Sequence, residues 1–216
     1  MNAPASTYPP DRTALLIIDP YNDFLSEGGK LWPSAQEVAE GIDQLDHMRA
    51  MLAAARELGF RVFIVPHHQT RPSDYRTWDQ LSPTQRRVVE RQVFALGSWG
   101  AEWHPDFVPR EDELVIGQHW SSSGFANTDL DMMLKQHGVQ RVVFIGMKAN
   151  TCVDTTARFA QELGYHVTLI RDAIGAFNWD EMKATFEVNA PAYAHAVLTT
   201  DEFLTIVGKR PRAMAS

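Results

Sequence analysis

Six short runs of apolar residues alternate along the chain with stretches whose apolar positions recur at helical spacing. The runs are rich in Val and Ile and do not alternate with polar residues, which is typical of strands buried on both faces of a parallel sheet. They cover residues 14–18, 61–66, 114–117, 141–145, 166–170 and 196–199.

The stretches between these runs indicate helices. Residues 38–58, 128–136 and 151–163 carry apolar positions at helical spacing, and each stretch stops near a glycine that suits a helix C-cap. Strands that alternate with helices predict a three-layer α/β/α fold with a doubly wound, mostly parallel six-stranded sheet. Ligands of such sheets bind beyond the carboxyl ends of the strands, so the chemistry is expected there.

Composition fits one domain. The chain has 216 residues, 44% of them hydrophobic, which is enough for a sizeable core. Residues 1–12 contain three prolines among small polar residues and are expected to form a flexible tail. No linker divides the rest, so residues 13–216 are expected to form a single domain.

Charge and cysteine content exclude several classes of function. The net charge of −7 and the lack of a basic run argue against nucleic-acid binding. No stretch of about 18 apolar residues predicts a membrane span, and residues 1–12 do not resemble a signal peptide. The single cysteine rules out an internal disulfide and a Cys-rich zinc cluster. A cytoplasmic protein with a small-molecule partner is therefore expected.

Two polar residues at predicted strand ends are candidates for catalysis. Asp19 follows the apolar run of the first strand directly, where it either serves the site or caps a turn. Cys152 lies at the predicted start of a helix, where the helix dipole and free backbone N–H groups favour a thiolate and lower its pKa. The alternative is an inert buried cysteine, which is common.

Histidines follow two other strands. His119 lies two residues beyond Gly117, so both face the same side of the strand and could point into the same pocket as Asp19 and Cys152. It could act as a base, an acid or a cation there, or could simply bind the serine-rich loop that follows. His67 and His68 are adjacent, so they point to opposite faces and form a poor metal site; no metal is expected.

Three segments resemble those of the isochorismatase-like cysteine hydrolases, the relatives of nicotinamidase, N-carbamoylsarcosine amidase and ureidoacrylate amidohydrolase. They read IDPYNDF at 18–24, SGFANTDL at 123–130 and NTCVDTTA at 150–157, in the family's order and spacing. The resemblance runs from about residue 13 to residue 207. It implies an Asp–Lys–Cys triad with Asp19 and Cys152, an oxyanion hole of the Lys148 and Cys152 backbone N–H groups, and a cis peptide bond before Lys148.

The sequence departs from this family in three places. The triad lysine is absent, and its position falls on Gly117 or His119. A glutamine that often follows the aspartate is Tyr21, and the metal-binding Asp-x-His of nicotinamidases is missing. Either His119 replaces the lysine, which we favour, or the Lys148 side chain supplies the charge, or the hydrolase is weak or inactive.

The resemblance implies hydrolysis of a small amide or related C–N bond through a Cys152 thioester, without a cofactor. A non-catalytic binding protein and a vinyl ether hydrolase of the isochorismatase type are the alternatives; the retained cysteine favours acyl transfer. Aromatic residues near the predicted mouth are candidates for substrate binding or for core and subunit contacts, namely Tyr21, Phe24, Trp32, Trp78, Trp120, Phe125 and Phe177. Specificity is expected in loops 69–82, 96–110 and 174–184, and the family usually forms homo-oligomers, so a dimer or tetramer is expected.

Overall fold

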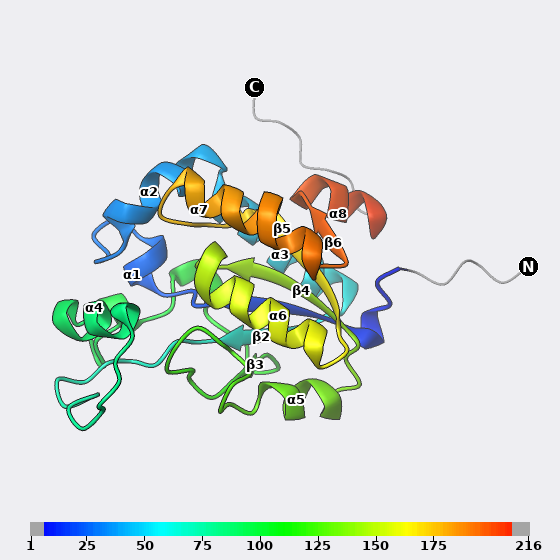
Figure 1. The fold of residues 1–216 in the computed structure, drawn as a ribbon. Coiled ribbons are helices and arrows are strands. Elements are labelled where there is room, and N and C mark those ends of the chain that lie inside the picture. Colours follow the sequence, from blue (N-terminus) through cyan, green and yellow to red (C-terminus); the bar gives the residue numbers. More distant parts are fainter. Residues whose placement is uncertain (1–6, 209–216) are drawn as a thin grey trace, which may run out of the picture.

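A parallel sheet of six strands forms the centre of the chain (Figure 1). The structure, a computed structural model, describes residues 7–208. The strands follow the order β3-β2-β1-β4-β5-β6, and every neighbouring pair is parallel. Their bounds are β1 (Thr13–Ile18), β2 (Arg61–Val65), β3 (Leu114–Val115), β4 (Arg141–Gly146), β5 (His166–Ile174) and β6 (Ala196–Leu198). The predicted doubly wound α/β fold is thereby confirmed.

Helices cover both faces of this sheet (Figure 1). The α-helices are α1 (Asn22–Leu25), α2 (Trp32–Gly41), α3 (Gln44–Leu58), α4 (Pro83–Arg91), α5 (Leu130–Gln136), α6 (Asp154–Glu162), α7 (Trp179–Lys183) and α8 (Thr200–Ile206). π-Helical turns span Ala149–Val153 and Ala184–Asn189, and 3₁₀ turns span Pro10–Arg12, Trp99–Ala101, Pro105–Phe107 and Ala190–Ala192.

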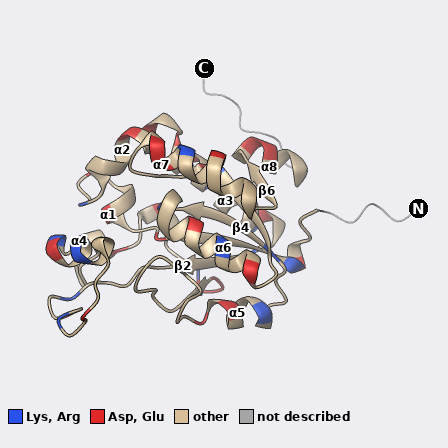
Figure 2. Cartoon of the chain, viewed as in Figure 1, with Lys and Arg blue, Asp and Glu red and all other residues tan. Residues whose placement is uncertain are grey.

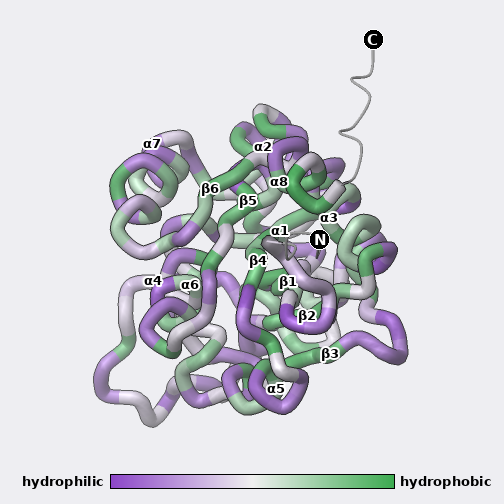
Figure 3. The backbone as a smooth tube through the Cα atoms, turned by 90° about the vertical axis from the view of Figure 1, so that its right-hand side faces the viewer, coloured by the Kyte–Doolittle hydropathy of each residue, from purple (hydrophilic) through white to green (hydrophobic). Residues whose placement is uncertain are grey.

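Alternation along β1 divides the core into two layers. Leu15 and Ile17 pack with side chains of α3 and α8, whereas Leu16 and Ile18 pack on the opposite face with those of α5 and α6. All residues of β1 are buried, as the apolar runs predicted. The hydropathy colouring shows the same arrangement, with apolar strands inside and more polar helices outside (Figure 3).

The single helix expected at 38–58 is in fact two. α2 ends at Gly41 and α3 begins at Gln44, because Asp43 between them adopts a left-handed conformation with φ 50°. The apolar periodicity continues across this break, which is why the sequence pattern did not reveal it.

The expected N-terminal tail is ordered in its second half. Residues 1–6 lie outside the described residues. Tyr8 is buried, and its hydroxyl shares a 2.9 Å hydrogen bond with Oγ1 of Thr168 on β5. A 3₁₀ turn then leads into β1. Within residues 7–208, none of the helices is both long and apolar enough to cross a membrane.

The order of the strands in the sheet indicates where a ligand is expected to bind. β1 has β2 on one side and β4 on the other, so the direction of winding reverses at β1. The crevice beyond the carboxyl ends of β1 and β4 is the expected ligand position in such a sheet. Asp19 follows β1, and the segment that carries Cys152 follows β4.

Candidate active site

Asp19 is held in an unusual backbone conformation at the end of β1. Its φ is 51°, which is uncommon for a residue other than glycine, and its backbone N–H donates to Val65 O at 3.1 Å. Gly146 at the end of β4 allows a close approach here, because a Cβ at that position would lie 2.2 Å from Ile18 O. The Asp19 side chain is fully buried, and its Oδ2 has no hydrogen-bond partner among residues 7–208.

His119 lies against this carboxylate. The strand register is continued beyond β2 and β3 by a parallel bridge between His67 and His119. His119 Nε2 lies 3.0 Å from Asp19 Oδ1, and both side chains are fully buried. The backbone therefore fixes His119 in the position that the sequence analysis favoured for the replacement of the lysine.

The second ring nitrogen defines the protonation of this pair. His119 Nδ1 lies 2.7 Å from the carbonyl oxygen of Ser121, which can only accept, so Nδ1 carries a proton. One further proton is shared between Nε2 and Asp19. Burial lowers the pKa of His119, but the charge of Asp19 and the hydrogen bonds to Asp19 and Ser121 outweigh it, so the pKa is raised. The charge of Asp19 thus stabilises the protonated form of the imidazole.

Cys152 completes the cluster from a π-helical turn that leads into α6. One ligand atom each of Asp19, His119 and Cys152 lie within 4.8 Å of one another. The pKa of the Cys152 thiol is raised well above its usual value, first by burial and then by the nearby charge of Asp19. The expectation that the helix start lowers this pKa is therefore wrong for the resting site. Desolvation and the nearby carboxylate keep the thiol protonated.

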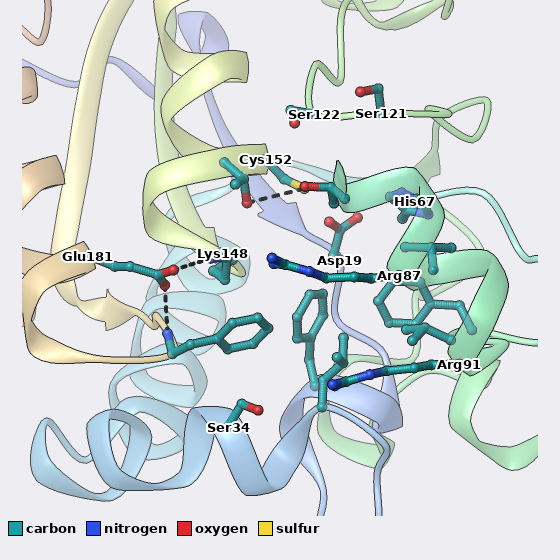
Figure 4. A pocket seen from close by; sticks show the side chains of 18 residues that line it. Asp19, Ser34, His67, Arg87, Arg91, Ser121, Ser122, Lys148, Cys152 and Glu181 are labelled. Atoms are coloured by element: carbon teal, nitrogen blue, oxygen red, sulfur yellow. Dashed lines mark hydrogen bonds and ion pairs between the residues drawn. The ribbon is translucent and has the colours of Figure 1, made fainter. Parts of the chain in front are cut away.

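The peptide bond Met147–Lys148 is cis, as the resemblance implied. The backbone N–H of Lys148 lowers the pKa of the Cys152 thiol, although less than burial raises it. The Lys148 side chain points elsewhere: Nζ pairs with Glu181 Oε1 at 2.7 Å and lies 4.3 Å from the ring centroid of Phe177 (Figure 4). Its charge is therefore neutralised by Glu181.

His67 and His68 diverge, as their adjacency predicted. The His67 ring packs edge-on against His119 with centroids 5.1 Å apart, and burial together with the His119 charge lowers the pKa of His67 to about 4. His68 instead pairs with Asp74 at 2.7 Å and stacks on Trp120. His67 is thus a neutral wall of the site, and His68 lies outside it.

A cavity of about 290 Å³ opens onto these groups (Figure 4). Its size suits a small molecule. Its walls are mostly apolar, with charged groups from α4, α7 and the catalytic cluster. The lining residues are Asp19, Phe24, Leu31, Ser34, His67, Thr84, Arg87, Val88, Arg91, Val93, Phe94, Ser121, Ser122, Lys148, Thr151, Cys152, Phe177 and Glu181.

Five of the seven candidate substrate-binding aromatics line a hollow. Phe24 and Phe177 line the cavity. Trp78 and Trp120 line a separate hollow that shares Ser121 and Ser122 with it, and Trp32 borders a third hollow at α2 and α3.

The prediction that Tyr21 and Phe125 bind substrate is wrong, because the structure places both side chains in the core. Tyr21 is fully buried, stacks on Trp103 and donates its hydroxyl to His67 O at 2.8 Å. Phe125 packs in the core beside Tyr165. An aromatic residue close in sequence to a catalytic one carries no signal about which way its ring points.

Sequence reasoning missed α4, which forms one wall of the cavity. The expected specificity loops 69–82 and 96–110 contribute nothing to the lining, whereas loop 174–184 contributes Phe177 and Glu181. A signal for α4 was present: Ser82, with Pro83 after it and Gln85 three positions on, forms a capping box.

Asp23 holds two backbone segments near the site together through hydrogen bonds of its carboxylate. Its Oδ2 accepts from the Phe94 backbone N–H at 2.7 Å, and its Oδ1 accepts from that of Lys30 at 2.9 Å. This carboxylate thereby ties the segment after β1 to the chain that follows α4. The motif contained Asp23, but the sequence did not indicate that its role is structural.

The cluster also offers the donor set of a metal site. A carboxylate oxygen, an imidazole nitrogen and a thiol sulfur converge within 4.8 Å, and zinc accepts all three ligand types. The raised thiol pKa and the direct His119–Asp19 contact are equally suited to acid–base chemistry without an ion. The metal-free site remains the prediction.

Comparison with known proteins identifies the family. The sequence model of the isochorismatase domain matches residues 13–202, which is most of the chain. The chain belongs to the isochorismatase family. Its fold and the resemblance of its three sequence segments both agree with this membership.

Curated relatives of this isochorismatase-family hydrolase include ureidoacrylate amidohydrolases. That of Cronobacter sakazakii is 30% identical over 181 residues, covering 78% of this chain and 77% of the relative. That of Klebsiella variicola is 27% identical over 177 residues, covering 77% and 75%.

Solved structures share the fold of this chain. A cysteine hydrolase from Pseudomonas syringae pv. phaseolicola superposes with a TM-score of 0.75 at 23% identity, covering 96% of this chain and 98% of the other. N-carbamoylsarcosine amidase from Thermoplasma acidophilum gives a TM-score of 0.63 at 26% identity, covering 88% and 98%.

Proposed function

We propose that the chain hydrolyses a small amide or carbamoyl C–N bond through a thioester on Cys152, with His119 in the role of the triad cation. The observation that carries this proposal is the convergence of Cys152, Asp19 and His119, of which Asp19 and Cys152 line a cavity of about 290 Å³. The relatives named as amidohydrolases support the bond type.

The first half of the reaction forms the thioester. Asp19 takes the thiol proton as the Cys152 sulfur attacks the substrate carbonyl carbon, and the C=O electron pair moves onto oxygen. The backbone N–H groups of Lys148 and Cys152 stabilise this oxyanion, each by about 3 kcal/mol where the geometry is well set. As the intermediate collapses, the C–N bond breaks and the departing amine takes the proton from Asp19.

The second half releases the acid. Water attacks the thioester carbonyl while Asp19 takes its proton, and the C–S bond breaks as that proton returns to sulfur. The resting thiol is protonated because its pKa is raised, so Asp19 must accept the proton during attack. The imidazolium of His119 supports this by compensating the charge of Asp19 at 3.0 Å.

A screen of small amides, ureides and carbamoyl compounds, read as ammonia release, tests the proposal. Wild type is expected to turn over, and Cys152→Ala to release no ammonia while it keeps its fold. Mass spectrometry after an acid quench is expected to show an acyl adduct on wild type. Absence of both turnover and adduct would favour the non-catalytic binding protein. Hydrolysis of a vinyl ether by Cys152→Ala at the wild-type rate would favour the isochorismatase reaction instead.

Dialysis against a chelator tests the proposed independence from metal. Activity is expected to survive this treatment. A loss of activity that added zinc restores would show that Asp19, His119 and Cys152 bind a metal ion. The homo-oligomer, a dimer or tetramer, and the cytoplasmic location also stay predictions. Sedimentation velocity and cell fractionation measure them.

A further inference from the structure

α4 presents one regular face to the cavity. Thr84, Arg87, Val88 and Arg91 all line it, and their spacing of three, four and seven residues places them on one side of a helix. Arg86 is on the same helix but outside this set. The capping box at Ser82 fixes the start of α4, and the buried Val88 anchors its inner side.

Two arginines on this face have no partner in the protein. Within residues 7–208, the guanidinium groups of Arg87 and Arg91 form neither an ion pair nor a hydrogen bond. The other charges at the cavity are matched, because Lys148 pairs with Glu181 and Asp19 with His119. Arg87 and Arg91 line the cavity and are both exposed to solvent, so the cavity carries two positive charges that no group in the described part of the chain compensates.

The side chains of Arg87 and Arg91 extend into the cavity. In Figure 4, Arg87 extends from α4 across the cavity toward Asp19 and Lys148, and Arg91 extends toward Ser34 on α2. Figure 2 shows that blue residues are otherwise scattered over the helices. Surface arginines normally turn to water or to a carboxylate, so two that face a catalytic cavity point to an anionic ligand.

The guanidinium group selects the chemistry of that ligand. Its planar fork matches a carboxylate with two parallel hydrogen bonds, and the apolar walls at Phe24 and Phe177 suit a short carbon chain. We propose that the substrate is a small amide or carbamoyl compound with a carboxylate, which Arg87 and Arg91 bind while the C–N bond lies at Cys152. The identity of the bond that breaks rests on the proposed function. The binding of a carboxylate by the two arginines does not depend on it.

Matched substrates isolate the carboxylate. Succinamate and 4-methylpentanamide have nearly the same shape, but two methyl groups replace the carboxylate oxygens in the second. N-carbamoyl-β-alanine and N-(3-methylbutyl)urea form the same kind of pair for the carbamoyl class. Wild type is expected to show kcat/KM at least tenfold higher for the charged member of the pair that it hydrolyses.

Matched variants isolate the arginines. Arg87→Gln is expected to raise KM for the charged substrate about tenfold or more with little change in kcat, and Arg91→Gln to raise it less. Both variants are expected to lower kcat/KM much less for the neutral substrate than for the charged one. Arg86→Gln removes an exposed arginine from the same helix outside the cavity and is expected to change neither. Equal kcat/KM values for charged and neutral substrates, or equal losses for both in Arg87→Gln, would overturn the inference.

Calorimetry separates the two proposals. Succinamate and N-carbamoyl-β-alanine are titrated into Cys152→Ala, which cannot form the thioester. Binding that weakens at least tenfold in Cys152→Ala/Arg87→Gln upholds the carboxylate site even if no substrate turns over, and then only the proposed reaction fails. Turnover of neutral amides without carboxylate binding would instead uphold the reaction and overturn the carboxylate site.

Discussion

His119 Nε2 lies 3.0 Å from Asp19 Oδ1, where we propose that the imidazole takes the role of the missing triad lysine. Because its other nitrogen donates to a backbone carbonyl, the imidazole holds a defined orientation and one proton is shared with the aspartate. A histidine can therefore supply the charge of the missing lysine, but only while it is protonated. This condition distinguishes the site from one with a lysine.

Replacement of His119 tests that role. His119→Ala is expected to lower kcat by about 10² to 10⁴, the usual contribution of a positioned acid–base group, because Asp19 loses its charge partner. His119→Lys is expected to restore part of this loss by returning a cation. Steady-state kinetics on the same substrate measure both variants. Full activity of His119→Ala would contradict the proposed role.

Lys148→Met is the control for the competing explanation. The Lys148 side chain pairs with Glu181, so its charge is expected to matter little for Cys152, and kcat is expected to stay within severalfold of wild type. The backbone N–H that the mechanism uses remains in this variant. A loss as large as that of His119→Ala would assign the cation to Lys148.

The two buried histidines predict a pH dependence of stability. Burial lowers the pKa of His67 from 6.5 to about 4, so the unfolded chain binds a proton that the folded chain refuses between these values. Stability is therefore expected to fall as the pH drops from 6.5 to 4, by about 3 kcal/mol from this residue. The pKa of His119 is raised, so its contribution is fully present below 6.5 and is lost as the pH rises through its folded value.

Urea unfolding at several pH values measures this effect. His67→Gln keeps a side-chain N–H donor for His68 O but does not titrate, so its stability is expected to fall less than that of wild type between pH 6.5 and 4. Because other groups titrate in both proteins, the difference between the two curves is the relevant quantity. Parallel curves would mean that His67 keeps its ordinary pKa in the folded protein.

The sequence predicted those parts of the fold and site that depend on local pattern and strand direction. Apolar runs located all six strands, and strand ends located Asp19, His119 and Cys152, because parallel strands bring their carboxyl ends to one edge. It could not predict the pKa of Cys152, which depends on burial and on the distance to Asp19.

The residues that line the cavity were harder to predict, because they too depend on contacts between distant parts of the chain. Tyr21 and Phe125 follow the pattern of site residues, yet their rings turn into the core, as tertiary packing and not sequence position decides. The break at Asp43 depends on one left-handed residue in an otherwise continuous helical pattern. Arg87 carried no signal until α4 was placed over the cavity.

Gly146 predicts a steric requirement next to Asp19. With φ 113° and a would-be Cβ 2.2 Å from Ile18 O, Gly146→Ala must push β4 away from β1. It is expected to destabilise the fold by about 2 kcal/mol or more and to lower kcat by displacing Asp19. Gly164→Ala is the control, because φ 90° strains it but no atom lies within 4 Å of the added Cβ. Urea unfolding and kcat measure both, and equal effects would contradict the steric argument.

The capping box of α4 gives a prediction that links local stability to substrate binding. Ser82 Oγ accepts from the Gln85 backbone N–H at 3.2 Å, and Gln85 Oε1 accepts from the Ser82 N–H at 3.0 Å. Ser82→Ala is expected to cost about 1 kcal/mol, most of it local to this short helix. Faster amide hydrogen exchange is expected in residues 84–91, together with a higher KM for a charged substrate, because Arg87 loses its fixed position. The rate of Cys152 alkylation by iodoacetamide is expected to stay unchanged, since the catalytic cluster depends on β1, β4 and the π-helical turn. A slower alkylation with unaltered exchange in α4 would show that Ser82 acts on the cluster directly and not through the helix.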